Sequence, residues 1–337
     1  MPTMQDVAKK AGVSLSTVSH ALSGKRPISE ETRQRIQQAI EELNYHPNEL
    51  ARRLANQQSR IIGMIFPRLA NNLTVMQLEF VMGAIEAADQ HGYSLLFSPS
   101  PMDDNDLTNF ARGGLVQGLI LMEIRLNDPR CEVLSKQGFP YVMIGRTSNP
   151  DGISYADLDF VHATSSAVSY LVENGHQKIA YIDYAPFLVE SGYGPAIRSL
   201  EGYRQTVNKY ELPEISLACN PTSLSGYEVV KKLLYDHPDV TAIITLNDNA
   251  IAGMYQATQE AGLHIPDNFS YIAIISSRRA EMFMPTLTTM DFPANEMGQA
   301  GVELLIQRLE NEDARPIHKL FEAKLTMRQS SGPASKL

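Results

Sequence analysis

The sequence has little of what several large classes of protein require. Its two cysteines, Cys131 and Cys219, are too few and too far apart for a disulfide framework or a zinc site. It contains no run of about 18 apolar residues, so no segment is expected to span a membrane. It also lacks a basic segment followed by an apolar stretch at its start, which argues against secretion. These absences predict a cytoplasmic protein that keeps its thiols reduced.

Signatures of catalysis are missing as well. The eight histidines are scattered, and no pair has the spacing of metal ligands. The sequence has no Gly-x-Ser-x-Gly elbow and no glycine loop of the kind that cradles phosphate. His176 falls at a turn between a predicted helix and a predicted strand, where a structural role is expected. We therefore expect no enzyme, no catalytic residue, no cofactor and no metal.

What the sequence does have is an uneven distribution of charge. Residues 1–60 carry nine lysines and arginines against six acidic residues, a net charge of +3. The whole chain has a net charge of −9, so the remainder carries −12. A basic head on an acidic body suits a protein that presents only its head to a phosphate backbone.

The first residues predict two short helices around a tight turn. Thr3 is a good N-cap, and Asp6 three residues later completes an acidic variant of the capping box. Gly12 supplies the left-handed residue that ends the first helix, and Ser14 caps the second. Ser29 caps a third helix over residues 30–43. The spacing is that of a helix-turn-helix, which places its second helix in the major groove of DNA.

The outer face of the second helix carries short hydroxyls, one imidazole and one leucine. Hydroxyl groups can hold phosphates, His20 can meet a base edge, and Leu15 can contact a thymine methyl group. We expect Leu15, Ser16 and His20 to read the bases. From spacing alone, a small helical bundle without any role in nucleic-acid binding remains an alternative.

Several motifs together narrow this interpretation. They are Asp6-Val7-Ala8, Ala11-Gly12-Val13-Ser14, Thr17-Val18-Ser19 and Asn44-Tyr45-His46-Pro47-Asn48, followed by Ala51-Arg52 and Leu54-Ala55. With them the chain resembles the lactose/galactose repressor family. The similarity continues through Gly175-His176-Gln177-Lys178-Ile179-Ala180, Asn247-Asp248, Pro285-Thr286-Leu287-Thr288-Thr289, Met297-Gly298 and Arg328-Gln329-Ser330. The resemblance covers nearly the whole chain and implies a repressor that binds palindromic double-stranded DNA.

Residues 48–55 predict a helix of about two turns, which is too short to be stable alone in water. Asn48 caps it, and the small Ala51 would let two copies pack closely in a dimer. The resemblance implies that Leu54 wedges between base pairs at the centre of the operator, with Arg52 and Arg53 on the flanking phosphates. The full set of predicted DNA contacts is Thr3, Ser14, Leu15, Ser16, Thr17, Ser19, His20, Ser29, Thr32, Tyr45, Asn48, Ala51, Arg52, Arg53 and Leu54.

From residue 60 onward, β-rich apolar segments alternate with helical ones, which predicts α/β structure with parallel sheets covered on both faces. The body is long for one such unit, so two are expected. Strands are predicted at 61–66, 93–97, 118–122, 141–144, 178–184, 242–246 and 271–275. Helices are predicted at 75–90, 107–114, 163–174, 200–209, 225–235 and 250–261.

The resemblance implies a two-lobed core like that of periplasmic binding proteins, with a small molecule bound between the lobes. The expected organisation is a helix-turn-helix domain at 1–47, a hinge helix and linker at 48–59, and a core at 60–329. Lobe one would take about 61–160 and 292–322, lobe two about 161–291, and 330–337 would be a flexible tail.

Loops that follow the strands supply the candidates for binding an effector, because ligands of such sheets bind at the carboxyl ends of the strands. Asn247 matches a family asparagine that commonly touches ligand. Two alternatives stay open: Asp248 as the N-cap of the next helix, and Arg146 in a surface salt bridge. The predicted effector contacts are Leu69, Asn71, Arg146, Arg198, Ser199, Asn247, Asp248, Ser276 and Phe292.

Two of these positions depart from the family pattern. Ser199 stands where an arginine is common, with Arg198 one residue earlier, and Ser276 stands where a carboxylate often holds sugar hydroxyls. A bidentate arginine and a buried carboxylate are strong orienting groups, so a standard monosaccharide contact scheme is in doubt. The alternatives are a larger saccharide, a different metabolite, or contacts through Arg146 and Arg198.

The leading interpretation is a transcriptional repressor whose operator affinity is controlled by a small-molecule effector, and the resemblance implies that this effector is a saccharide. One alternative is the same regulator controlled by a protein partner, with a vestigial cleft. Another is a sugar-binding protein without a role on DNA. No helix of coiled-coil length fits after the core, so a homodimer is expected rather than a tetramer.

Overall fold

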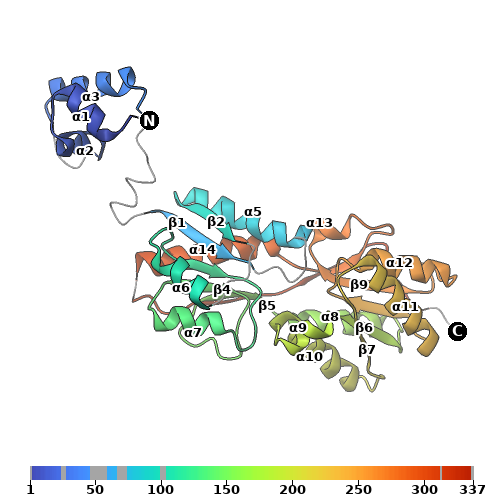
Figure 1. The fold of residues 1–337 in the computed structure, drawn as a ribbon. Coiled ribbons are helices and arrows are strands. Elements are labelled where there is room, and N and C mark those ends of the chain that lie inside the picture. The colour runs from blue at the N-terminus through green and yellow to red at the C-terminus, as the bar shows by residue number, and fades with distance from the viewer. Residues whose placement is uncertain are drawn as a thin grey trace. The chain divides into compact units, whose positions relative to one another are not determined.

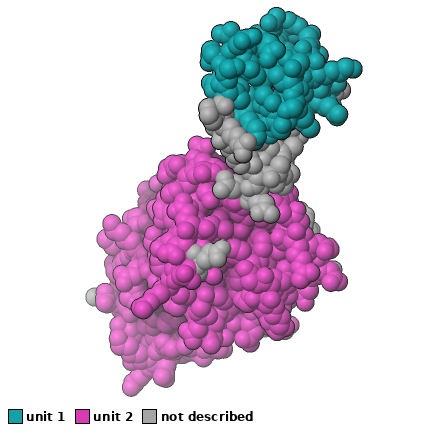
Figure 2. Space-filling view, turned by 90° about the vertical axis from the view of Figure 1, so that its left-hand side faces the viewer, with its two compact units in different colours: residues 1–59 teal, residues 60–337 magenta. Residues whose placement is uncertain are grey.

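A computed structural model of the chain describes residues 2–23, 28–45, 59–66, 74–98, 104–311 and 313–334. The chain divides into two compact units, residues 1–59 and 60–337, which are coloured separately in Figure 2. The predicted hinge contacts Asn48, Ala51, Arg52, Arg53 and Leu54 lie outside the described residues, as do the predicted effector contacts Leu69 and Asn71.

The described residues of the first unit form the helices α1 (Met4–Ala11), α2 (Leu15–Ser23) and α3 (Glu30–Glu42) (Figure 1). The predicted capping box of α1 is present, with both the Thr3 and the Asp6 side chains bonded to backbone amides. Gly12 has a φ of 65°, as its place at the end of α1 requires. Ser14 accepts a hydrogen bond from the amide of Thr17, and Ser29 caps α3. These local predictions are confirmed.

The first sheet of the larger unit is entirely parallel, in the order β11-β5-β4-β3-β1-β2. Helices α5 and α14 pack on one face of this sheet, and α6 and α7 pack on the other. Its strands are β1 (Ile61–Ile65), β2 (Ser94–Ser98), β3 (Leu119–Leu121), β4 (Tyr141–Ile144), β5 (Tyr155–Leu158) and β11 (His318–Phe321). Its helices are α5 (Val75–Gln90), α6 (Asp104–Arg112), α7 (Pro129–Lys136) and α14 (Ala294–Glu310).

The second sheet has the order β12-β10-β9-β8-β6-β7, and β12 is antiparallel to β10. Helices α8 and α10 pack on one face, and α11 and α12 pack on the other. Its strands are β6 (Ile179–Asp183), β7 (Ile215–Ala218), β8 (Ala242–Thr245), β9 (Ser270–Ile275), β10 (Thr288–Asp291) and β12 (Lys324–Thr326). Its helices are α8 (Phe160–Glu173), α9 (Pro186–Glu190), α10 (Gly194–Lys209), α11 (Ser223–Asp236), α12 (Ile251–Glu260) and α13 (Ser277–Ala280).

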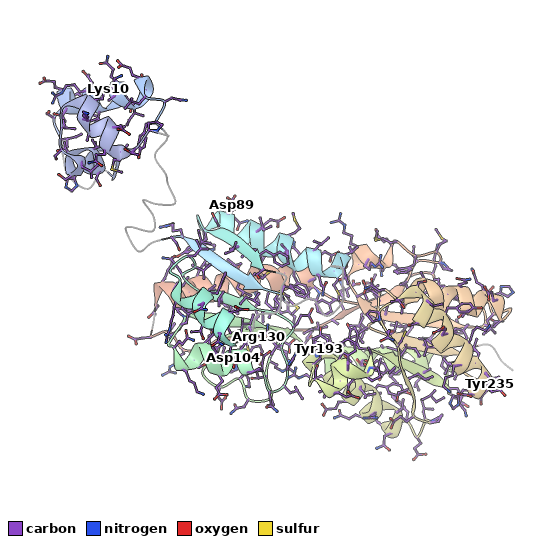
Figure 3. All side chains as sticks on the ribbon, viewed as in Figure 1. Lys10, Asp89, Asp104, Arg130, Tyr193 and Tyr235 are labelled. Carbon is purple, nitrogen blue, oxygen red and sulfur yellow. The ribbon has the colours of Figure 1, made fainter. Side chains whose placement is uncertain are left out.

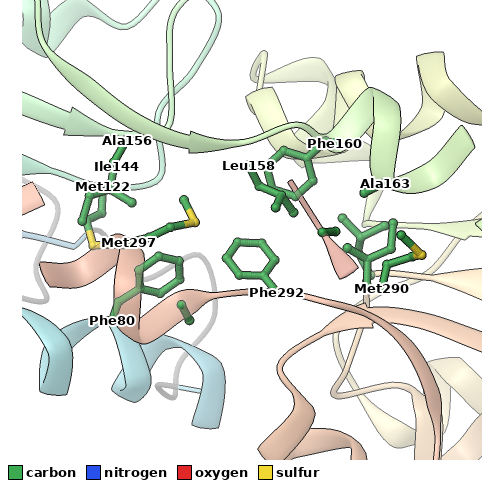
Figure 4. Close-up of a cluster of buried hydrophobic side chains, with 14 of the residues drawn as sticks. Phe80, Met122, Ile144, Ala156, Leu158, Phe160, Ala163, Met290, Phe292 and Met297 are labelled. Atoms are coloured by element: carbon green, nitrogen blue, oxygen red, sulfur yellow. The ribbon is translucent and has the colours of Figure 1, made fainter. Parts of the chain in front are cut away.

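The chain crosses between the two sheets after β5, after β10 and after β11. The first two crossings carry Phe160 and Phe292, whose rings lie close to each other in Figure 4. The lobe that contains the first sheet is called lobe one below, and the other lobe two. The predicted fold class is confirmed: a helical N-terminal domain is followed by two α/β lobes whose sheets are parallel except for the edge strand β12.

The prediction of a flexible tail at 330–337 is wrong for its first five residues. Ser330 is fully buried, and its hydroxyl accepts from the amide of Thr288 (2.8 Å) and donates to the carbonyl of Tyr271 (2.7 Å). The Ala334 amide donates to the Asn174 carbonyl (2.8 Å). The segment is polar because its side chains and backbone bond directly to the second sheet and to the end of α8. A polar composition therefore did not indicate disorder here.

His176 has the structural role that the sequence predicted. Its Nε2 donates to the carbonyl of Gly332 (3.1 Å), and its Nδ1 lies 2.8 Å from the hydroxyl of Thr241. Burial lowers the pKa of this imidazole. The ring thereby joins the end of the chain to the second sheet. None of the described helices is long and apolar enough to cross a membrane.

Candidate functional site

Helix α2 presents the face that the sequence assigned to DNA. Leu15 is 48% exposed although it is apolar, and Ser14, Ser16 and Ser19 are exposed beside it. The Ser14 hydroxyl lies 2.8 Å from the hydroxyls of both Ser16 and Thr17. Val18 of the same helix is fully buried in the core of the unit. Hydroxyls that bond to one another at the surface can exchange those bonds for bonds to phosphate oxygens.

The other predicted DNA contacts of the first unit have different surroundings. Thr3 and Ser29 remain exposed while they cap α1 and α3, and Thr32 bonds to the Ser29 hydroxyl (2.8 Å). His20 is half-buried at the end of α2. Tyr45 is 9% exposed and belongs to the core of the unit, so the structure does not place it on the exposed face of α2.

A cavity lies between the two lobes of the larger unit. It encloses about 1000 Å³, part of which is open to solvent. Its wall includes Glu123 and Asp157 from lobe one, and Asn247 and Asp248 from lobe two.

Most of the cavity wall is apolar. Phe292 packs edge-on against Phe80, with ring centroids 5.6 Å apart, and Phe160 lies 5.7 Å away on the other side. Figure 4 shows these rings at the centre of a cluster that reaches into both lobes. Of its labelled side chains, those that line the cavity are Phe80, Met122, Ile144, Phe160, Phe292 and Met297.

Arg146 and Arg198 both approach Asp157, which lines the cavity. The Arg146 guanidinium pairs with the Asp157 carboxylate at 2.7 Å, and that of Arg198 lies 3.8 Å from it. Burial raises the pKa of Asp157 to about 6, although both guanidiniums oppose the shift. Arg146 therefore forms a salt bridge, which was one of the two interpretations left open, but its partner is a buried carboxylate and the pair does not lie at the surface.

Arg198 also connects the two lobes. It extends from α10 and donates to the backbone carbonyls of Arg146 (2.9 Å) and Thr147 (3.2 Å) in lobe one. Neither Arg146 nor Arg198 is part of the cavity wall among the described residues. The arginines that were expected to hold the effector thus bind the protein itself.

Asn247 and Asp248 line the cavity, as the sequence predicted. The Asn247 amide nitrogen donates to the carbonyls of Cys219 (2.9 Å) and Asn220 (3.3 Å), which fixes the orientation of the side chain. Asp248 pairs with Arg279 at 3.2 Å. Asp248 is not the N-cap of α12, because that position is held by Ala250.

The two serines that depart from the family pattern lie outside the cavity wall. Ser199 is fully buried on the inner face of α10, near the Tyr181 hydroxyl. The Ser276 hydroxyl donates to the Glu79 carboxylate (2.9 Å), which joins the end of β9 in lobe two to α5 in lobe one. Burial raises the pKa of Glu79. Ser276 is therefore engaged in a contact between the lobes.

Glu123 was not among the predicted residues, although it lines the cavity directly after β3. Its Oε1 accepts a hydrogen bond from the Gln77 side chain (3.1 Å). Burial raises the pKa of Glu123, while hydrogen bonding by Tyr193 and Gln77 acts in the opposite direction. The same rule that selected Arg146, a polar residue just after a predicted strand, would have selected Glu123.

The residues after Glu123 join lobe one to lobe two. The Leu126 amide donates to the Gly192 carbonyl (2.7 Å), and the Gly194 amide donates to the Ile124 carbonyl (3.1 Å). Arg130 supports this segment from lobe one, since its guanidinium donates to the Glu123 carbonyl (3.2 Å). Figure 3 labels Arg130 and also Tyr193, which stands in the sequence between Gly192 and Gly194. Within the described residues, no group of acidic, histidine and cysteine side chains is arranged to hold a metal ion.

Comparison with known proteins identifies the family. Residues 3–48 match the family described as bacterial regulatory proteins, lacI family, and residues 168–331 match the periplasmic binding protein-like domain. The ribose operon repressor of Escherichia coli (strain K12) is 30% identical over 320 residues, which cover 92% of this chain and 93% of that protein. The chain belongs to the lacI family of bacterial regulatory proteins.

Other lacI-family proteins are similar along almost the entire chain. Catabolite control protein A of Priestia megaterium is 28% identical, with 98% of this chain and 99% of that protein covered. The crystal structure of the Lac repressor dimer bound to operator and the anti-inducer ONPF has a TM-score of 0.85 and 25% identity, over 98% of this chain and 99% of that one. A CelR-cellobiose complex has a TM-score of 0.73 and 26% identity, over 98% of this chain and all of that one.

This lacI-family chain is therefore a DNA-binding transcriptional regulator, as the helix spacing and the resemblance predicted. The relatives named above are regulators rather than enzymes. The alternative of a sugar-binding protein without a role on DNA is not favoured.

Proposed function

We propose that this regulator is a cytoplasmic repressor that binds a palindromic operator as a homodimer. A saccharide bound in the cavity between the lobes controls its affinity for the operator. The observation that carries the proposal is a cavity lined by residues of both lobes, in a chain that also has an exposed helix-turn-helix. The solved complexes of CelR with cellobiose and of Lac repressor with operator and ONPF support it.

The DNA contacts follow from the exposed face of α2. Leu15, Ser16 and His20 read base edges, and the neighbouring hydroxyls of Ser14 and Thr17 hold phosphates. The contacts proposed for Leu54 and its neighbours belong to residues outside those that the structure describes.

An apolar stripe on α5 supports the homodimer. Leu78, Met82 and Ile85 fall on one side of the helix and are 47%, 51% and 44% exposed. Exposed apolar side chains that gather on one helix face mark an interaction surface. Light scattering is expected to give the mass of a dimer, and the mass of a tetramer would contradict the expectation.

Control by a protein partner with a vestigial cleft is a weaker alternative. A cavity that has lost its function would be expected to fill with its own side chains, because protein interiors are closely packed. The observed cavity retains unfilled space and polar groups from both lobes.

The DNA-binding part of the proposal can be tested with the full chain. DNA is selected from a random pool, and affinity for the selected site is measured by fluorescence anisotropy at several salt concentrations. Leu15→Ala is expected to weaken binding by about tenfold, in line with the roughly 1–3 kcal/mol that one base-pair contact contributes. Tyr235→Ala is the matched control, since Tyr235 is 88% exposed on α11 of the other unit. Recovery of no preferred sequence, or equal binding by both variants, would refute the assignment of α2.

A further inference from the structure

Glu123 differs from the other carboxylates of the cavity in having no cationic partner. Asp157 pairs with Arg146, and Asp248 pairs with Arg279. Its Oε1 accepts a hydrogen bond from the neutral Gln77 side chain (3.1 Å), and the nearby Arg130 guanidinium, whose charge lowers the pKa of Glu123, forms its own salt bridge with Asp128. Its Oε2 is buried, and no donor among the described residues reaches it. A buried acceptor without a donor costs about 1–3 kcal/mol, so its retention needs an explanation.

The backbone of Glu123 supports a specific role for this side chain. Its φ is 55°, in the left-handed region that few residues other than glycine occupy. The Arg130 guanidinium, which donates to the Met122 (2.9 Å) and Glu123 carbonyls, holds this turn. Strained residues of this kind are concentrated at functional sites. The turn places the Glu123 side chain in the cavity wall instead of leaving it in solvent.

A second buried acceptor belongs to a cavity-wall residue of lobe two. The Oδ1 atom of Asn247 is buried without a donor among the described residues, while its amide nitrogen bonds to two carbonyls. The buried side-chain atoms of the described cavity wall that lack a hydrogen-bond partner are thus two acceptors, one from each lobe. A ligand that satisfies both must bring hydrogen-bond donors.

The charge of the wall restricts the ligand further. The described wall contains three carboxylates, those of Glu123, Asp157 and Asp248, and contains no lysine, arginine or histidine. Asp157 and Asp248 are paired with arginines that are not part of the wall, so Glu123 is the carboxylate whose charge an anionic ligand would meet, and the buried position would make the desolvation of that ligand costly. The aromatic rings around Phe292 suit the apolar face of a sugar ring.

We propose that Glu123 is a specificity-determining residue of the effector site: its Oε2 accepts a hydrogen bond from a hydroxyl group of an uncharged saccharide, and the site rejects phosphorylated and carboxylated sugars. Glu123 supplies from lobe one the carboxylate that Ser276 does not supply from lobe two. This inference rests on the proposed function, because it assumes that the cavity holds the effector.

The experiment measures binding to the full chain by thermal shift and calorimetry. The neutral probes are ribose, glucose, maltose and cellobiose, and the charged ones are glucose 6-phosphate, gluconate and glucosamine. At least one neutral saccharide is expected to raise the melting temperature, as a ligand of the native state must. Its anionic counterpart is expected to produce no shift. Stronger binding of an anionic or cationic sugar, or no binding of any neutral one, would overturn the proposal.

Glu123→Gln tests the residue itself. The substitution keeps the size of the side chain but places a donor where Oε2 accepts, so affinity for the neutral saccharide should fall about 10- to 100-fold, as expected for a hydrogen bond to a charged group. Glu303→Gln, on the exposed side of α14, is the matched control and should bind like the unaltered chain. Equal affinity of the two variants would refute the role of Glu123. If Glu123→Gln does not fold, the comparison of neutral with anionic probes on the unaltered chain still decides the charge selectivity.

Failure of this inference can be told apart from failure of the proposed function. Selective operator binding without a response to any probe would leave DNA binding in place and remove the saccharide effector. A saccharide that binds both variants equally and releases operator would leave the proposed function in place and remove only Glu123.

Discussion

Replacement of Gly298 by alanine should loosen the packing of α5 against α14 in lobe one. A Cβ atom at Gly298 would lie 2.1 Å from the Phe80 carbonyl oxygen and 3.1 Å from the Ala84 amide nitrogen. The contact is reciprocal, since a Cβ at Gly83 would lie 2.0 Å from the Asn295 carbonyl oxygen. Ordinary contacts of a Cβ begin at 3.4 Å, so the two helices would have to separate by more than an ångström.

Two effects of opposite sign set the size of the change. Alanine is a better helix former than glycine by about 1 kcal/mol. Overpacking of a well-packed core costs about 1–3 kcal/mol, and more when backbone rather than a flexible side chain must move. Because the clashing atom at Gly298 is a backbone oxygen, the clash should dominate. We expect a net loss of about 1–3 kcal/mol in the free energy of unfolding.

The assay is urea unfolding followed by circular dichroism. Glu303→Ala is the control, because it also introduces an alanine into α14, but on the exposed side of the helix. It should change the free energy of unfolding by less than about 0.5 kcal/mol. Gly298→Ala should also weaken binding at the cavity, since α5 carries Phe80 and α14 carries Met297 in its wall. A Gly298→Ala chain as stable as the unaltered one would refute the argument from close helix contact.

Three further predictions concern buried polar groups. Burial raises the pKa of Asp183 to about 6 from 3.8, so its carboxyl favours the native state below pH 3.8, and that contribution is lost as the pH rises through 6. Asp183→Asn should therefore stabilise the chain by about 1–3 kcal/mol at pH 7 and by almost nothing at pH 3.5, measured by urea unfolding at both pH values. Ser330→Ala leaves the buried Thr288 amide without its acceptor and should cost about 1–3 kcal/mol, whereas an unchanged urea midpoint would show that the end of the chain is not anchored. Arg198→Lys, which cannot reproduce the planar fork that spans two carbonyls and approaches Asp157, should lower the melting temperature measurably in scanning calorimetry; an unchanged value would argue against this connection between the lobes.

The features predicted well from the sequence depend on residues a few positions apart. Thr3 bonds to Asp6, and Ser29 bonds to Thr32, so the sequence places both partners side by side. Strands with continuous apolar runs, such as Tyr141–Ile144, were located because a strand buried on both faces needs no alternation. The strands β5, β7, β10, β11 and β12 were not predicted. β7, β11 and β12 are at least partly exposed along most of their length, and the buried β5 and β10 contain polar residues such as Asp157 and Thr288, so neither group shows a continuous apolar run.

The sequence by itself thus determined the helix-turn-helix, the alternation of strands and helices, and the polar residues that follow several strands. Only the tertiary structure decided which of those residues face the cavity. Ser276 bonds to Glu79, which is 197 residues away, and Arg198 bonds to carbonyls more than 50 residues away. Such contacts arise when two lobes, each built from separate parts of the chain, close against each other. The same closure buries Glu123 beside Tyr193, and no local pattern in the sequence records that pairing.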